Sequence, residues 1–438
     1  MTLEALMDAL RAAPAFAHKG DIRPVMDGLA GLDSGHLPLG DDAAALADGD
    51  GFLLMAMEGF VNEFVAAEPF FAGYCGVMVN VSDIAAMGGR ALAVTDALWS
   101  RGDDQSAAIL AGLREAAGKY GVPLVGGHSN AHCDRPQLSV AILGRARALL
   151  TSFDARPGDT LMVACDLRGR FRAVGDNWDA SSDAPGARLR GDLAILPGLA
   201  EGGLCRAGKD ISMAGPVGTA LMLLEASGVG AVLDLDALPR PPGVPLERWL
   251  HAFPSYGFVL SVAPDRAAEV TRRFRARELA VAEVGRVTAG DRLELTLDGR
   301  RAPFWDHRIT PYIGRPFSAS SHPAIKEVTM PEVHFDVRWP DRSEQSCYSP
   351  STVIHDFLRA GESYPLAEFL ALSRDALTLA GDRVEQKYGF RCTSADSQLL
   401  ALETRGRQFA GRPDARVTVT RVGTATPAPS STFNEETP

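Results

Sequence analysis

The sequence lacks any apolar run approaching the ~20 residues that a membrane-spanning helix needs, and its mean hydropathy is −0.01. It also lacks a secretory start. The pattern of Met1–Phe16 is that of an amphipathic helix carrying Glu4 and Asp8, whereas a signal peptide has a basic stretch and an apolar core. These absences predict a cytoplasmic protein without a membrane partner.

Paired cysteines at metal-binding or redox spacing are missing as well. The six cysteines are scattered and form no CxxC motif, which favours reduced, partly buried thiols over a disulfide framework or a zinc site. No Ser/His/Asp or Cys/His constellation for nucleophilic catalysis stands out. A net charge of −11 argues against nucleic acid as a partner, so the cations that a phosphate-bearing ligand needs must be supplied locally.

A chain of 438 residues is long enough for two or three domains. Strand and helix patterns alternate through two units, 1–150 and 151–325, which predicts an α/β (α+β) fold. A third, small α+β unit spans 330–412 and opens with a hairpin formed by 333–339 and 345–348. The Pro/Ser/Thr-rich end, 424–438, is predicted to be disordered.

An acidic residue interrupts the apolar segment Asn80–Gly89, which reads NVSDIAAMGG. The run Val77–Val81 has the composition of a buried strand, although the longer stretch 70–88 also fits a helix. We interpret the run as a strand that leads into a helix at Ser82 and Asp83. An unpaired buried carboxylate is costly, so Asp83 either caps the helix or binds a divalent cation.

A second acidic segment, Gly40–Ala45, reads GDDAAA. The adjacent carboxylates of Asp41 and Asp42 repel each other unless solvent or a cation separates them, and oxygen ligands of this kind suit Mg²⁺. An exposed turn is the alternative. Glu58, at the end of an apolar strand, presents the same choice between a cation ligand and an exposed carboxylate.

Glycine-containing segments suit an anion. Gly126 and Gly127 follow a strand, where their N–H groups would form an anion-binding nest at a turn. Gly208 and Lys209 precede a helix that starts near Pro216, a favourable place for phosphate.

Three other polar segments are candidates. His128 is either structural or an acid–base or phosphate partner, and Lys19, in a basic loop near the N-terminus, is placed to reach a terminal phosphate. The segment Asn177–Asp179 is interpreted as a surface loop, with lining of the site as the alternative.

Together, the two acidic segments resemble the ATP-dependent superfamily of aminoimidazole ribonucleotide (AIR) synthetase and thiamine-monophosphate kinase. Hydrogenase maturation factor HypE and selenophosphate synthetase share that fold. The resemblance covers about 15–290 and is nearest to the AIR synthase-like, Sll0787-like branch. It implies a PurM-type two-domain fold, ATP and Mg²⁺ as cofactors, a small-molecule substrate, and a homodimer that pairs the half-barrels of the first domains.

The resemblance also implies roles for individual residues. The Mg²⁺ ligands are Asp41, Asp42, Glu58 and Asp83. The nucleotide contacts are Gly40, Asp42, Asn80, Asp83, Gly126, Gly127, Gly208 and Lys209. The catalytic residues are Lys19, His128 and Asp210. The chain departs from its relatives at His128 and Met213, where they usually have acids, and at Glu58, where they have Thr-Asp.

The third unit resembles a separate family, the MSMEG_0570-like proteins of the nitrogen-starvation response. The segments that carry the likeness are Val337–Asp341, Cys347–Pro350, Ser363–Leu366 and Lys387–Phe390.

We therefore predict ATP-dependent phosphoryl transfer that activates an oxygen of a small nitrogenous metabolite, in nitrogen metabolism. Thiamine-monophosphate kinase activity is one alternative, although Pro254–Leu260 replaces the kinase motif Gly-Glu-Asp-Tyr-Glu-Leu. A nucleotide-binding regulator or scaffold without turnover is another, favoured by His128 and Met213.

Overall fold

The computed structural model describes residues 1–29, 35–173, 175–314, 333–349, 351–388, 393–409, 411–412 and 414–423. The predicted disordered tail, 424–438, lies outside these residues. The chain divides into two compact units, residues 1–321 and 322–438. Among the described residues, no helix combines the length and the apolarity that crossing a membrane requires.

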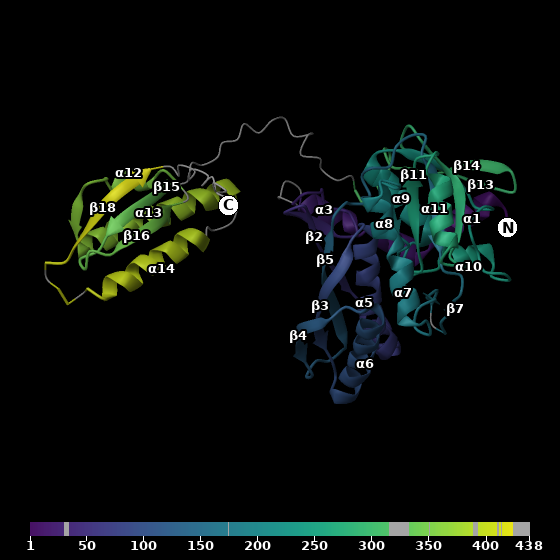
Figure 1. Cartoon of the computed structure of the whole chain (residues 1–438), viewed down its shortest axis with the longest axis horizontal. Helices are drawn as coiled ribbons and strands as arrows, with labels where there is room; N and C mark the ends of the chain where they lie inside the picture. Colours follow the sequence, from purple (N-terminus) through teal and green to yellow (C-terminus); the bar gives the residue numbers. More distant parts are fainter. Residues whose placement is uncertain are drawn as a thin grey trace, which may run out of the picture. The chain divides into compact units, whose positions relative to one another are not determined.

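The first sheet of the larger unit has five strands in the order β1-β2-β5-β3-β4. They are β1 (Ala44–Asp48), β2 (Gly51–Gly59), β3 (Arg90–Trp99), β4 (Leu124–Asn130) and β5 (Gln137–Ala146). Helix α5 (Pro69–Ala86) packs against β2, β3 and β5, and α6 (Asp103–Tyr120) packs along α5 (Figure 1). The short helix α4 (Asn62–Ala67) precedes α5.

The predicted strand over Val77–Val81 is wrong, because this run lies in the middle of α5. Almost every residue from Phe71 to Ala86 is buried, since the helix contacts the first sheet, α6 and strand β9 (Ala207–Asp210). A helix buried on all sides has a continuous apolar sequence, which a short window does not distinguish from a buried strand. Asp83 therefore lies near the C-terminus of a helix and does not cap an N-terminus.

Helices α5 and α6 approach so closely that their contact requires glycine. A Cβ on Gly112 would lie 1.9 Å from the carbonyl oxygen of Phe70, and one on Gly73 would lie 2.0 Å from that of Ile109. Gly112→Ala should lower the free energy of unfolding by about 2–3 kcal/mol, because the methyl group forces the helices apart. At the exposed position Gly118, nothing lies within 4 Å of an added Cβ.

Gly118→Ala is the matched control for this prediction. It should be neutral or stabilise the chain by about 0.5–1 kcal/mol, because alanine is the better helix former. Urea unfolding of both variants measures the difference. Equal midpoints would contradict a close helix contact at Gly112.

The second sheet has seven strands in the order β14-β13-β10-β12-β6-β11-β9. They are β6 (Thr160–Cys165), β9, β10 (Gly230–Asp234), β11 (Gly257–Val262), β12 (Ala280–Thr288), β13 (Arg292–Leu297) and β14 (Arg300–Asp306). Only β10 and β13 pair in parallel. The alternation of strand and helix patterns predicted for this unit is confirmed.

Helices and a short ribbon complete the larger unit. The helices are α1 (Leu3–Ala12), α2 (Pro14–Lys19), α3 (Ile22–Gly28), α7 (Gly186–Leu193), α8 (Ile195–Glu201), α9 (Gly215–Ser227), α10 (Leu246–Leu250) and α11 (Ala267–Arg275). The ribbon pairs β7 (Arg170–Phe171) with β8 (Trp178–Asp179). Leu3, Leu6 and Leu10 of α1 belong to the core of the second sheet, so the chain begins at this sheet, crosses to the first and returns.

The smaller unit is a four-stranded sheet in the order β16-β15-β18-β17 with three helices. Its elements are β15 (Val333–Arg338), β16 (Glu344–Ser349), α12 (Ile354–Phe357), β17 (Ser363–Pro365), α13 (Leu366–Tyr388), α14 (Thr393–Arg407) and β18 (Arg416–Gly423). The predicted hairpin is confirmed as β15 and β16. Helix α13 is continuous over its 23 residues.

Candidate functional site

Carboxylates from three distant segments meet in the larger unit. Asp42 lies just before β1, Asp83 lies near the end of α5, and Asp210 ends β9. Each offers an oxygen, and these oxygens all lie within 4.8 Å of one another. Contact between α5 and β9 brings the latter two together. Three carboxylate oxygens at this spacing are a ligand set for Mg²⁺.

The surroundings of these carboxylates disfavour negative charge. Burial raises the pKa of Asp210 to about 7, and the charge of Asp42 adds to the effect. Burial, followed by repulsion from Asp210 and Glu58, raises the pKa of Asp83 well above its usual value. Among the described residues, the buried Oδ2 atom of Asp83 has no hydrogen-bond partner, and the helix dipole at this end of α5 opposes an anion. A bound cation would relieve each of these costs.

Asp41 and Asp42 are held in different ways. Asp41 accepts hydrogen bonds from the amide and the hydroxyl of Ser152, at 2.8 and 2.6 Å. Burial raises the pKa of Asp41 to about 6, against the attraction of Lys209. Asp42 accepts a bond from the Lys209 ammonium at 2.5 Å and one from the Asp210 amide at 3.1 Å. Asp42, and not its neighbour, contributes to the three-carboxylate cluster.

Glu58 and Lys19 lie on the same cavity wall as the cluster. Burial raises the pKa of the Glu58 carboxyl, and attraction to Lys19 opposes this rise. The ammonium of Lys19, at the end of α2, therefore acts electrostatically on Glu58.

The cavity that contains the cluster has a volume of about 750 Å³, which is within the range of small-molecule and cofactor sites. Eight of the predicted site residues line it: Lys19, Gly40, Asp41, Asp42, Glu58, Asp83, Lys209 and Asp210. Most of the remaining wall is apolar and includes Met26, Phe60, Phe64, Val79 and Phe253. The charged lining is thus suited to metal and phosphate, and the apolar lining to an aromatic base or an apolar body.

Two residues predicted to contact the nucleotide make hydrogen bonds within the protein instead. The side-chain amide of Asn80 is fully buried and donates to the carbonyls of Gly76 and Val140, at 2.7 and 3.0 Å, so it joins α5 to β5. The amide of Gly208 already donates to the carbonyl of Thr151. Neither residue is among those that line the cavity of about 750 Å³, called the larger cavity below.

The predicted turn at Gly126 and Gly127 is wrong, because both glycines lie inside β4 and pair with Thr95 and Asp96. His128 follows in the same edge strand, and its ring centroid lies 6.2 Å from that of Trp99. All three residues are exposed and do not line the larger cavity. Among the described residues, the structure does not bring them to the carboxylate cluster.

Sequence reasoning missed two serines that hold the acidic residues. Ser152 fixes Asp41, and the Ser255 hydroxyl donates to Asp210 at 2.8 Å. Ser255 has a φ of 49°, which is strained for serine and common at functional sites. The segment around Asn177 is buried, so its interpretation as a surface loop is wrong, and Asn177 lines the larger cavity.

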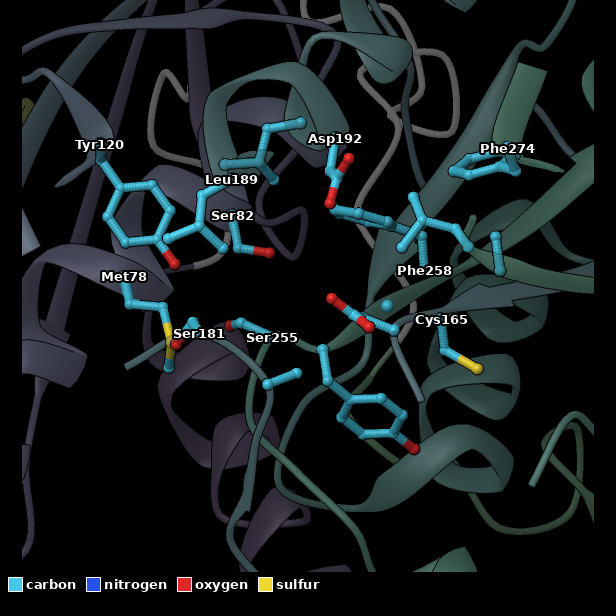
Figure 2. Close-up of a pocket in the computed structure, with 17 residues that line it drawn as sticks. Met78, Ser82, Tyr120, Cys165, Ser181, Leu189, Asp192, Ser255, Phe258 and Phe274 are labelled. Carbon is cyan, nitrogen blue, oxygen red and sulfur yellow. The ribbon is translucent and has the colours of Figure 1, made fainter. Parts of the chain in front are cut away.

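A smaller cavity, of about 60 Å³, adjoins the site through Ser255, which lines both. Figure 2 shows Met78, Ser82 and Ser181 on one side of it and Asp192 and Phe258 on the other. The Ser82 hydroxyl is buried without a hydrogen-bond partner among the described residues. The space has the size and polarity to hold a few ordered waters behind the carboxylates.

Comparison with known proteins identifies the family to which this chain belongs. Residues 40–146 match the N-terminal domain, and residues 179–298 the C-terminal domain, of the AIR synthase related protein family. A protein from Synechocystis sp., described as uncharacterized protein sll0787, is 46% identical over 299 residues, which cover 68% of this chain and 91% of that protein. The chain belongs to the AIR synthase related protein family.

Other relatives of this AIR synthase related protein are named for an activity or were solved with a bound ligand. A thiamine-monophosphate kinase from Halobacterium salinarum is 31% identical over 300 residues, which cover 66% of this chain and 100% of the kinase. The solved structure of T. maritima PurL complexed with ATP aligns with a TM-score of 0.56 at 15% identity, covering 96% of this chain and 78% of PurL. This second likeness confirms the predicted PurM-type two-domain fold.

Two further matches complete the comparison. The structure of tt0281 from Thermus thermophilus aligns with a TM-score of 0.51 at 28% identity, covering 62% of this chain and 95% of tt0281. Residues 334–422 match the nitrogen starvation-induced protein NitG. The AIR synthase related protein therefore carries a C-terminal NitG domain.

Proposed function

We propose that this chain is a Mg²⁺- and ATP-dependent enzyme that transfers the γ-phosphoryl group of ATP to an oxygen of a small nitrogenous metabolite. The observation that carries the proposal is the cluster of Asp42, Asp83 and Asp210, in which a buried carboxylate oxygen lacks a partner. The T. maritima PurL structure with ATP and the thiamine-monophosphate kinase relative support a nucleotide at this site.

The residues that line the cavity would have different roles in such a transfer. A Mg²⁺ ion bound at the cluster, with Asp83 and Asp210 as its ligands, would supply positive charge to the phosphate oxygens. Lys19, which also lines the cavity and acts electrostatically on Glu58, provides an ammonium for the phosphates. The apolar wall, with Phe60 and Phe64, takes the adenine base. The bond from the γ-phosphorus to its bridging oxygen breaks, a bond to the acceptor oxygen forms, and ADP leaves.

A screen for ADP release tests this proposal. The full chain is incubated with ATP, Mg²⁺ and single carboxamides, amidine precursors or alcohols, and acceptor-dependent ADP is measured. Thiamine phosphate is included, because the Halobacterium salinarum relative makes thiamine-monophosphate kinase the second candidate. Nucleotide binding without acceptor-dependent ADP in any reaction would instead support a regulator, in line with Met213 in the cavity wall where relatives have an acid. The NitG domain motivates the choice of nitrogenous acceptors.

We infer further that a second copy of the chain covers the free face of the first sheet. Met55 pairs with Leu143 on the neighbouring strand, and Met55, Met57 and Leu143 are 54%, 70% and 37% exposed. Since α5 covers the opposite face, these side chains form an open apolar surface among the described residues of this unit, which is typical of an interface. The family resemblance supports this pairing of first domains.

Met57→Glu should convert the expected dimer to a monomer of 46.6 kDa, because it places a charge in the apolar contact. Ile309→Glu is the matched control: Ile309 is equally exposed, at 70%, but follows β14 in the second sheet. Sedimentation equilibrium measures both variants. A wild-type chain that sediments as a monomer would contradict the inferred interface.

A further inference from the structure

Lys209 is a buried cation inside the acidic site. It extends from β9, and its ammonium lies 2.5 Å from Asp42 Oδ1, with 6% of the lysine side chain and 7% of the aspartate side chain exposed. Its charge also acts on Asp41 and Asp210. An ion pair this deeply buried has little solvent screening and does not readily come apart.

The ion pair changes how many oxygens remain for metal. One Asp42 oxygen accepts from Lys209 and the other accepts from the Asp210 amide. In contrast, Asp83 Oδ2 has no partner, and Asp210 accepts a side-chain bond from Ser255. The carboxylate oxygens that remain free to bind a metal ion therefore belong to Asp83 and Asp210.

The charges that line the cavity also bear on how many metal ions the site binds. Six carboxylates line the cavity, and five of them act on one another electrostatically: Asp41, Asp42, Glu58, Asp83 and Asp210. At the spacing of about 4.8 Å found in the cluster, two like charges repel by about 3.5 kcal/mol at an effective dielectric constant of ~20. Several cations are thus needed, and Lys209 supplies one that is covalently attached.

We propose that the Lys209 ammonium permanently takes the place of one divalent cation, so that the nucleotide-free site binds a single metal ion at Asp83 and Asp210. This inference rests on the proposed function, because it concerns the same metal site. Removing the ammonium leaves Asp42 as a buried, unpaired carboxylate. That carboxylate then becomes available to bind a second metal ion.

Titration with Mn²⁺ alone, followed by electron paramagnetic resonance of the free ion, tests the proposal on the full, nucleotide-free chain. The wild type should bind one Mn²⁺ in the site, and Lys209→Met, which keeps the side-chain length but not the charge, should bind two. Lys19→Met is the matched control, since it removes an ammonium from the same cavity but not from Asp42, and it should bind one. Asp83→Asn removes a ligand of the site, so the Mn²⁺ that it still binds measures the ions bound elsewhere on the chain.

A second variant guards against misfolding. Lys209→Gln keeps a hydrogen-bond donor for Asp42 without the charge and should also bind two ions, with urea unfolding confirming the fold of each variant. Two site ions in the wild type, or one in both folded Lys209 variants, would overturn the proposal and leave the proposed function standing. A wild type that binds no Mn²⁺ in the site would overturn the metal site itself and, with it, this proposal.

Discussion

Asp83→Asn is expected to stabilise the metal-free chain and at the same time to abolish Mg²⁺-dependent ATP binding. In the folded chain the Asp83 carboxyl is buried, faces Asp210 and Glu58, and has an unpaired oxygen. The unfolded chain ionises the same carboxyl freely at pH 8. Asparagine removes this difference, so the free energy of unfolding in EDTA should rise.

The same substitution removes a metal ligand, and ATP binding in Mg²⁺ should weaken at least ~100-fold, which corresponds to about 2.7 kcal/mol. Urea unfolding in EDTA and calorimetric titration in Mg²⁺ measure the two effects. Asp50→Asn is the control, because Asp50 is an exposed partner of Arg145 with 81% of its side chain accessible. A variant at Asp83 that is less stable without metal and still binds ATP would show that this carboxylate is structural.

The metal-free chain should lose stability as the pH rises from about 4 to 7. Burial raises the pKa of Asp41 to about 6 and that of Asp210 to about 7, from an ordinary value of 3.8. The folded chain then holds protons that the unfolded chain has released, so the free energy of unfolding falls across this window and levels off above it. For Asp210 alone, the change is on the order of 4 kcal/mol.

Mg²⁺ should reverse this dependence, because it binds the ionised carboxylates. Its stabilising effect should be small at pH 5 and large at pH 8, with protons released on binding. Thermal unfolding between pH 5 and 8, in EDTA and in Mg²⁺, measures the pattern. Asp210→Asn should flatten the EDTA profile, which separates this site from carboxylates elsewhere in the chain. A Mg²⁺ effect that is equal at every pH, or an unchanged profile in the variant, would contradict the account.

The sequence located the acidic residues better than the backbone around them. Two adjacent aspartates and an aspartate in an apolar run indicate compensated burial of charge, and the structure brings Asp42 and Asp83 together with Asp210. The strand predicted over Val77–Val81 failed because a helix buried on all sides has no polar face to reveal its period. The carboxylates were recognisable, but the element that carries Asp83 was not.

Glycine was the less informative signal. Gly126 and Gly127 suggested an anion-binding turn, yet they lie in edge strand β4, and the Gly208 amide donates to the carbonyl of Thr151. Glycine permits close approach of a ligand or of another backbone equally well. Which of these occurs depends on tertiary contacts.

The serines that orient the site had no local signature. Ser152 and Ser255 are separated by more than a hundred residues, and each contacts an aspartate that is distant in the sequence, Asp41 for Ser152 and Asp210 for Ser255. The domain boundaries near 150 and 325 and the roles of individual site residues stay predictions. The family itself was predictable, because the two acidic motifs recur at a characteristic order and spacing.

The central claim is that the carboxylate cluster forms a Mg²⁺–nucleotide site, and calorimetric titration of ATP into the full chain tests it most directly. Binding in Mg²⁺ that disappears in EDTA, and that Asp42→Asn also removes, is the predicted result. The ADP screen would then identify the acceptor. Failure of the wild-type chain to bind ATP in Mg²⁺, or equally tight binding by Asp42→Asn, would contradict the account.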